Sequence, residues 1–460
     1  MKQYRITLIF LLISFITVQC QNSSENTNMK ALPAEVVETI EKRIEEGVTP
    51  SIAIAIIDSS SIQYFSFGRT AEDGKKVDEN TIYEIGSISK VFTAIILAQQ
   101  VQKSELKLED EINSFLPNDI KVPVMGDMDI TFGNLTDHTS GLPRMPDNFN
   151  PANPNNPFAD YSVDQMYEFI SNYQPVRTVG SEYEYSNIAQ GLLGHLLALC
   201  NNSTYEELMI QSLANPLDMN DTRIKFTQRM KENLALGHSR GEVVENWAIP
   251  ALPGAGAIRS STSDMAKFIS ANLGYVNNSF MEAMKLTHKV RHDKAGDMSV
   301  AMAWHIKKGD NGDVIWHNGG TGGYSTFAGF VKETGKGVVL LTNSSTGSDD
   351  IGFYLLDPGS KLKALRFKSE AVDIAESTLE QYVGVYELQP EFKITVSKEG
   401  KQLFIQATGQ ERIEIYPENE TVFYLTVVKA KITFKLKRGV VKSLTLLQGG
   451  RKTTGLKLED

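Results

Sequence analysis

A long apolar run gives the chain its clearest pattern. Residues 91–97 are almost all apolar, and the run continues without Pro or Gly to Gln102. This pattern predicts a buried helix. Ser87 and Lys90 stand at its start, three residues apart, so we expect the hydroxyl and the amine to share one face of the first turn. The unpaired backbone N–H groups of that turn would face a ligand in front of the helix.

Helical and strand patterns alternate through most of the chain. Residues 33–47 carry apolar positions at the helical period, and residues 188–199 predict an apolar helix. Runs rich in β-branched residues, bounded by turn residues, indicate strands. The expected strands are a hairpin of residues 51–57 and 61–67, and an antiparallel meander of residues 300–306, 314–317, 325–331 and 337–342.

The C-terminal part of the chain has a different pattern. Residues 357–376 are charged and contain a Pro-Gly pair, which indicates a linker. Short strands separated by turns follow in residues 377–460 and predict a small all-β barrel or sandwich. We therefore expect one domain in residues 34–356, then the linker and the β domain. The expected strands of the β domain are 382–388, 393–396, 403–407, 413–416, 422–427, 432–436 and 443–447.

The N-terminus has the pattern of an export signal. A short basic start precedes an apolar run that is too short to span a bilayer comfortably and that ends at Cys20. Residues 1–20 resemble a bacterial lipoprotein signal, and residues 21–33 read as a polar tether. We expect a lipid on Cys20 to anchor the protein in the cell envelope, at the periplasmic face or the outer membrane. Gln19 departs from the small residue that such signals prefer, so ordinary cleavage with export, or an uncleaved anchor, are alternatives.

Composition narrows the function classes. The 460 residues carry a formal charge of −10 and show no basic block that would neutralise phosphates, so we expect no nucleic-acid partner. Two cysteines are too few for a disulfide scaffold. Cys200 ends an apolar run, and we expect it to be a buried free thiol. We expect no metal ion and no cofactor.

Tyr185 and Asn187 form a second candidate group, just before the helix expected at residues 188–199. A neighbouring lysine ammonium favours the phenolate form of a tyrosine, which would make Tyr185 a competent base. Asn187 offers an amide donor and an acceptor, which suits contact with a substrate amide. Tyrosine and asparagine also occur in ordinary turns, so this pair alone is a weak signal.

A glycine-rich stretch supplies a third candidate group. Residues 317–324 contain His317 and four glycines, which let a backbone approach a ligand closely. The N–H of Gly320 would then face the same oxygen as the N–H of Ser87 and complete an oxyanion hole. The alternative is a flexible hairpin loop. His138 lies in a separate turn, and we expect a structural, hydrogen-bonded role for it.

The three groups share an order and a wide spacing with one known family. They are Ser87 with Lys90, Tyr185 with Asn187, and His317 with Gly319. Ser-x-x-Lys is a signature of β-lactamases and penicillin-binding proteins. With all three groups in place, residues 33–345 resemble the serine hydrolases of the class C β-lactamase and penicillin-binding type. The β domain resembles the lipocalin-like appendage of some peptidase-like members.

This resemblance implies a fold and a set of roles. The fold is α+β, with an antiparallel sheet flanked by helices, a mostly helical subdomain, and the site in the groove between them. Ser87 corresponds to the nucleophile, and Lys90 and Tyr185 correspond to the pair that transfers protons. Asn187 corresponds to the residue that contacts a substrate amide.

The third motif departs from the lysine-containing form of the family. His317 takes the lysine position, with Gly319 two residues on, and Gly320 stands where the family's second oxyanion-hole N–H is found. A histidine near its ordinary pKa of about 6.5 is mostly neutral at pH 7, so it lacks the permanent charge that attracts a substrate carboxylate. Similar His-x-Gly forms occur among carboxypeptidases, aminopeptidases and esterases of the family.

We therefore expect a serine hydrolase that forms an acyl-enzyme on amide or ester bonds. The expected substrates are D-amino-acid peptides, with β-lactams as mimics or secondary substrates. Two alternatives are an esterase for small acyl groups and a cell-envelope receptor that binds peptidoglycan fragments with slow or no turnover. The presence of every expected catalytic residue type favours an enzyme.

Overall fold

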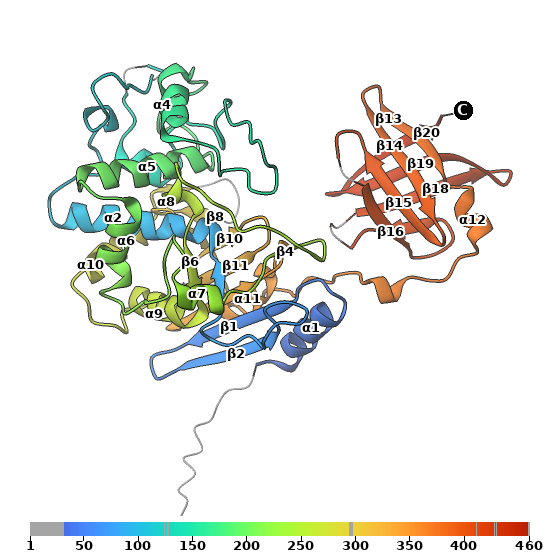
Figure 1. Cartoon of the computed structure of the whole chain (residues 1–460), viewed down its shortest axis with the longest axis horizontal. Helices are drawn as coiled ribbons and strands as arrows, with labels where there is room; N and C mark the ends of the chain where they lie inside the picture. Colours follow the sequence, from blue (N-terminus) through green and yellow to red (C-terminus); the bar gives the residue numbers. More distant parts are fainter. Residues whose placement is uncertain are drawn as a thin grey trace, which may run out of the picture.

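The computed structural model describes residues 32–123, 125–126, 128–293, 298–410, 412–426, 428 and 430–458. Cys20, the predicted signal of residues 1–20 and residues 21–31 of the predicted tether lie outside these residues. The chain forms a larger α+β part followed by a β-barrel (Figure 1). This arrangement confirms the predicted fold class.

An eight-stranded antiparallel sheet forms the centre of the α+β part. Its strands, in order across the sheet, are β2 (Ile62–Gly68), β1 (Ser51–Ile57), β12 (Lys336–Thr342), β11 (Ser325–Val331), β10 (Val314–Gly320), β9 (His305–Lys307), β8 (Met298–Val300) and β7 (His292–Asp293). The predicted N-terminal hairpin is confirmed, and β1 joins it to the C-terminal meander by pairing Ile54 with Leu340 on β12. The first and last parts of this domain therefore build one sheet.

The predicted strand at residues 300–306 is wrong. Residues 301–304 form a tight turn between β8 and β9, closed by a 2.9 Å bond from the Ala301 N–H to the Trp304 carbonyl. Ala303 takes a positive φ of 60° in this turn. All four residues of the turn are buried. Their apolar character hid the turn, because turns are usually recognised by polar residues and glycine.

Helices cover both faces of the sheet, as the alternation along β1 requires. Ile52 and Ile54 pack with α1 (Ala34–Glu45) and α11 (Asp349–Leu356), whereas Ala53 and Ala55 face the core that contains α2 (Ser89–Gln102). The other helices are α3 (Phe132–Thr136), α4 (Val163–Asn172), α5 (Asn187–Cys200), α6 (Tyr205–Met209), α7 (Gln228–Glu232), α8 (Pro253–Gly256), α9 (Thr262–Asn272) and α10 (Met281–Thr287).

Helix α2 is buried along almost its full length, as its composition predicts. Phe92 stacks on Phe268 of α9 at 4.3 Å between ring centroids. Helix α5 meets α8 through glycines, since a Cβ on Gly194 would lie 3.0 Å from the Cα of Gly254. Cys200 is the last residue of α5 and is exposed. The prediction of a buried thiol is wrong because the helix leaves the core at its end.

The C-terminal strands close into a barrel. They are β13 (Gly384–Gln389), β14 (Phe392–Glu399), β15 (Gln402–Ala407), β16 (Arg412–Pro417), β17 (Val422–Tyr424), β18 (Ala430–Lys437), β19 (Val440–Gln448) and β20 (Arg451–Lys457). Their up-and-down order is that of lipocalins. The predicted linker region contains a short 3₁₀ helix, η4 (Lys368–Glu370), and leads into α12 (Glu376–Glu380).

Seven of these strands match the predicted ones, and β20 was not predicted. This strand is mostly polar, and its one buried residue is Gly455, which lies against the backbone of Glu387. Glycine and polar residues are depleted in strands, so the pattern was weak. The closing strand of the barrel is therefore specified by its neighbours rather than by its own propensity.

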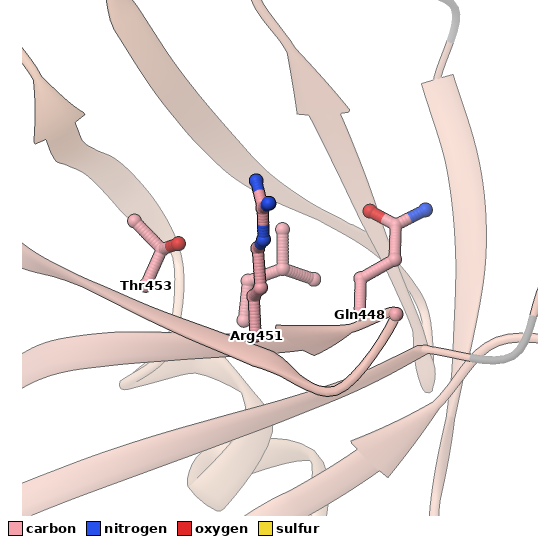
Figure 2. Close-up of a pocket in the computed structure, with 5 residues that line it drawn as sticks. Gln448, Arg451 and Thr453 are labelled. Carbon is pink, nitrogen blue, oxygen red and sulfur yellow. The ribbon is translucent and has the colours of Figure 1, made fainter. Parts of the chain in front are cut away.

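Side chains fill the centre of the barrel, and a separate cavity lies at one of its hairpins. Tyr382 stacks on Phe434 at 4.2 Å between ring centroids, within a core of aromatic and aliphatic residues. At the end of the β19–β20 hairpin, Gln448, Arg451 and Thr453 surround a cavity of about 500 Å³ (Figure 2). This cavity belongs to the barrel and contains none of the predicted site residues.

A close backbone crossing fixes the sheet against the start of α2. The 3₁₀ turn η1 (Gly86–Ile88) precedes α2, and Gly86 has a positive φ of 51°. A Cβ on Gly86 would lie 2.7 Å from the amide nitrogen of Gly320 on β10, and a Cβ on Gly319 would collide with the Ile85 carbonyl. Thr326 of β11 also donates a 3.0 Å bond to that carbonyl. Only glycine allows this approach.

We expect Gly86→Ala to lower the free energy of unfolding by about 2–5 kcal/mol, because positive-φ strain adds to a backbone collision. Gly47→Ala is the matched control, since Gly47 has a φ of 67° but open space around its Cβ position. It should cost only about 1–2 kcal/mol. Urea unfolding followed by tryptophan fluorescence measures both, because Trp247, Trp304 and Trp316 all precede the barrel. Equal losses would contradict the role of the crossing.

Candidate active site

Ser87 is the one partly exposed residue in the buried segment of residues 81–100. Every other residue from 81 to 100 is buried, whereas Ser87 is partly exposed. It lies in η1 and not yet in α2, which begins at Ser89. Its N–H lies in the first turn, where backbone donors lack partners within the helix. The predicted placement of the hydroxyl at the head of a buried helix is confirmed.

Lys90 is fully buried beside this hydroxyl. Its Nζ lies 3.0 Å from the Ser87 Oγ and donates a 2.6 Å bond to the carbonyl of Ala255 in α8. Burial lowers the pKa of Lys90 well below the ordinary lysine value, and the charge of Arg144 lowers it further. A neutral amine next to a serine hydroxyl can accept its proton.

Tyr185 lies next to both Ser87 and Lys90. Its phenol hydrogen-bonds to Ser87, and the Lys90 Nζ lies 4.9 Å from the centroid of the Tyr185 ring. Burial raises the pKa of Tyr185 to about 12, although Ser87 and the charge of Arg144 oppose that shift. The phenolate predicted from the sequence would need a lowered pKa, so the shift is opposite to that prediction. Tyr185 therefore holds its proton at neutral pH and is suited to donate it, while Lys90 is the stronger candidate for the base.

His138 holds Tyr185 in place. The two rings stack at 4.6 Å between centroids, and the His138 Nδ1 accepts a 3.1 Å bond from the Ser186 N–H. The His138 carbonyl also accepts a bond from the Glu184 N–H, and its φ is +63°. His138 is thus hydrogen-bonded, as predicted, and its contacts are with the segment that carries Tyr185.

Asn187 is the first residue of α5. The hydroxyl of Ser186 caps the helix by accepting the Ala189 N–H at 3.0 Å. The Asn187 N–H donates a 2.9 Å bond to the Arg144 carbonyl, and its side-chain amide lies 3.4 Å from the Sδ of Met145. The cap and this bond fix the start of the helix two residues after Tyr185, and the Asn187 side chain lies against Met145.

His317 lies on β10 and is almost fully buried. Its ring stacks on His305 at 4.9 Å between centroids and lies 6.3 Å from the ring of Tyr185. Burial lowers the pKa of His317 well below the ordinary value, and the nearby His305, Lys90 and His138 act in the same direction. The expected neutral state of His317 at pH 7 therefore follows from its surroundings as well as from its residue type.

The tautomer of His317 follows from its hydrogen bonding. Nδ1 lies 2.5 Å from the Asn318 carbonyl, which can only accept, so Nδ1 carries the proton. Nε2 is then an acceptor, and it is buried without a hydrogen-bond partner among the described residues. A substrate donor would satisfy it.

The end of β10 brings the third group to Ser87. Gly320 is exposed with open space beside it, and its amide nitrogen faces Gly86 at the crossing described above. The N–H groups of Ser87 and Gly320 thus belong to adjacent backbone segments. All three candidate groups predicted from the sequence meet at one place.

Aromatic residues border this place on the side of the glycine-rich turn. Trp247 Nε1 lies against Gly322, and it donates a 3.1 Å bond to the Asn155 carbonyl. The ring of Phe158 lies 5.3 Å from Trp247. Residues 149–161 therefore contribute an apolar wall beside the turn that follows Gly320.

Sequence reasoning missed Arg144. Its guanidinium lies 5.0 Å from the centroid of Tyr185, and its charge reaches Lys90 and Tyr185. The residue follows a Gly-Leu-Pro turn, and no periodicity or spacing marks it. Its position depends on how that turn packs against α5, which a single sequence does not reveal.

Residues 36–356 match the family described as Beta-lactamase. The chain belongs to this family. The match confirms the resemblance drawn from the three motifs and places the chain among penicillin-binding and class C β-lactamase-like serine hydrolases. Residues 368–456 match a second family, described as Domain of unknown function (DUF3471).

Curated members of the family align over most of the chain. "Penicillin-binding protein 4*" of Bacillus subtilis (strain 168) is 26% identical over 431 residues, which cover 85% of this chain and 90% of that protein. "Beta-lactamase" of Escherichia coli (strain K12) is 26% identical, covering 74% and 95%. "D-alanyl-D-alanine-carboxypeptidase/endopeptidase AmpH" of the same organism is 24% identical, covering 64% and 79%.

Solved structures of the family share the fold. An octameric penicillin-binding protein homologue from Pyrococcus abyssi superposes with a TM-score of 0.62 at 21% identity, covering 91% of this chain and 99% of that one. A class C beta lactamase from Rhodobacter sphaeroides gives a TM-score of 0.59 at 21% identity, covering 67% and 93%. At this identity the likeness concerns the fold alone.

We expect acylation of Ser87 by a penicillin to proceed at neutral pH and to slow as the pH falls through the lowered pKa of Lys90, because an ammonium cannot accept the serine proton. Lys90→Met should reduce the acylation rate by about 10²–10⁴-fold. Intact-mass time courses from pH 5 to 10 measure the rate, and Lys103→Met, at the exposed end of the same helix, is the control. A rate that rises only near the ordinary lysine pKa of about 10.4 would show that Lys90 is charged at neutral pH.

Proposed function

We propose that the protein hydrolyses an amide or ester bond through an acyl-enzyme on Ser87. The observation that carries this proposal is the 3.0 Å contact between the Ser87 hydroxyl and the buried amine of Lys90. As the Ser87 Oγ attacks the carbonyl carbon, its proton passes to Lys90, and the carbonyl electron pair moves onto oxygen. The N–H groups of Ser87 and Gly320 stabilise that oxyanion.

Tyr185 takes part in the second half of the cycle. When the bond to the leaving group breaks, the departing nitrogen or oxygen takes the phenol proton, and the Lys90 ammonium restores it. Water then attacks the acyl-enzyme and gives its proton to the Lys90 and Tyr185 pair, and Ser87 is released with its hydroxyl. The raised pKa of Tyr185 supports its role as a donor, because the phenol is present at neutral pH.

The proposed substrates are peptides that end in a D-amino acid, with β-lactams as mimics. Two curated relatives support this class by their names, "Penicillin-binding protein 4*" and "D-alanyl-D-alanine-carboxypeptidase/endopeptidase AmpH". The side chain of Asn187 supports it chemically, because it offers an amide donor and an acceptor that can pair with a substrate amide.

An esterase for small acyl groups is the second candidate. The neutral state of His317 favours it, since this position offers no fixed positive charge for the carboxylate of a peptide or a β-lactam. A small ester needs no such charge. The apolar wall that contains Trp247 and Phe158 would suit the hydrocarbon part of a small acyl group.

We also propose that Cys20 carries a lipid that holds the enzyme in the cell envelope. The polar residues after Cys20 would then act as a tether. Among the described helices, none combines the length and apolar character needed to cross a membrane.

We expect intact-mass time courses to show an adduct on Ser87 with a penicillin, and turnover of either a D-Ala-terminated peptide or a short ester. Ser87→Ala should show neither adduct nor turnover, and adduct decay reports the rate of deacylation. Faster turnover of the peptide than of the ester supports the peptidase, and the reverse supports the esterase. An adduct that persists in Ser87→Ala would refute the nucleophile.

We expect Cys20→Ala to move the protein from the membrane fraction to the soluble fraction of a bacterial host and to abolish incorporation of a labelled fatty acid. Cys200→Ala removes the other, exposed cysteine and should change neither result. Fatty-acid labelling that survives in Cys20→Ala would exclude this anchor.

A further inference from the structure

The site contains two residues whose charge is suppressed by burial. Lys90 is fully buried and its pKa is well below the ordinary value, and the same holds for His317. Neither residue offers a lasting positive charge to a substrate. A substrate anion therefore needs another partner.

Arg144 meets that need. Its side chain is exposed, its guanidinium lies 5.0 Å from the Tyr185 ring centroid, and its charge is felt at both Lys90 and Tyr185. Within the described part of the chain, Arg144 forms no ion pair. Other arginines nearby do, since Arg177 pairs with Glu184 and Arg259 with Glu84. An arginine carries a permanent charge and binds carboxylates through two parallel hydrogen bonds.

The backbone places Arg144 on a definite side of the site. Its carbonyl accepts the Asn187 N–H at 2.9 Å, and the next residue, Met145, contacts the Asn187 side chain at 3.4 Å. His317 stands on β10, on a different segment from Asn187. If Asn187 holds the amide of the acyl half of the substrate, Arg144 lies near that half.

We propose that Arg144 is a specificity-determining residue that binds a carboxylate on the acyl half of the substrate. The site then prefers acyl donors with a carboxylate at the end of a short acyl chain over neutral donors of the same length. This inference rests on the proposed acyl-enzyme chemistry and names the substrate class of that site. The positive charge comes from Arg144, in the segment between α3 and α4, and not from the third motif, where His317 stands in place of a lysine.

The test compares two esters with one leaving group, mono-p-nitrophenyl adipate and p-nitrophenyl hexanoate, whose acyl chains have equal length. The full-length wild-type enzyme should show a higher kcat/KM for the adipate. In Arg144→Gln we expect the adipate-to-hexanoate ratio of kcat/KM to fall about tenfold, because one partly exposed charge-assisted hydrogen bond is lost. The change should come mainly from a higher KM for the adipate. Arg144→Lys should recover part of the ratio, and added salt should lower it in the wild type.

Arg229→Gln is the control, because Arg229 is an exposed arginine on α7 that pairs with Asp221. It should keep the wild-type ratio. A wild-type ratio near one, or a ratio that Arg144→Gln and Arg229→Gln change equally, would overturn the inference while leaving the acyl-enzyme intact. Failure to hydrolyse either ester, together with no penicillin adduct on Ser87, would overturn the proposed function and this inference with it.

Discussion

The burial of the Lys90 amine beside the Ser87 hydroxyl is the constraint on which the site depends. An amine in water is charged at neutral pH and cannot take a proton from a serine, so this chemistry needs a place from which water is excluded. Helix α2 supplies that place because it is buried almost throughout, and Ser87 alone reaches the surface in residues 81–100. The same low-polarity surroundings keep Tyr185 protonated and His317 neutral.

Direct contacts between backbone segments assemble this site, together with the contacts of its side chains. Glycines let β10 touch η1, where Gly86 and Gly320 are more than 200 positions apart in sequence, and other glycines let α5 touch α8. Gly320 and Ser87 come together through the first contact, and Ala255 reaches Lys90 next to the second. A methyl group at one crossing would separate the groups that the chemistry brings together.

The local spacing of residues could be predicted from the sequence, but the burial and the neighbours of each side chain could not. The Ser87 and Lys90 pair follows from helical spacing, and the strands of the meander follow from composition. The phenolate expected for Tyr185 was wrong because its protonation depends on burial by segments distant in sequence. The turn at residues 301–304 and strand β20 were missed because one is apolar and the other polar, each against the usual rule. Arg144 carries no signature, since only tertiary packing brings it to Tyr185.

The C-terminal barrel is closed by a short contact. Strands β13 and β20 pair at two positions, Tyr386 with Lys457 and Glu387 with Leu456. Residues 451–455 of β20 pair with β19 on one side and with no described strand on the other. The outer backbone groups of this stretch are therefore an edge to which another polypeptide can add a strand. The central sheet of the hydrolase also ends in edges, at β2 and β7. Edge pairing with another chain is thus open to both parts of the molecule.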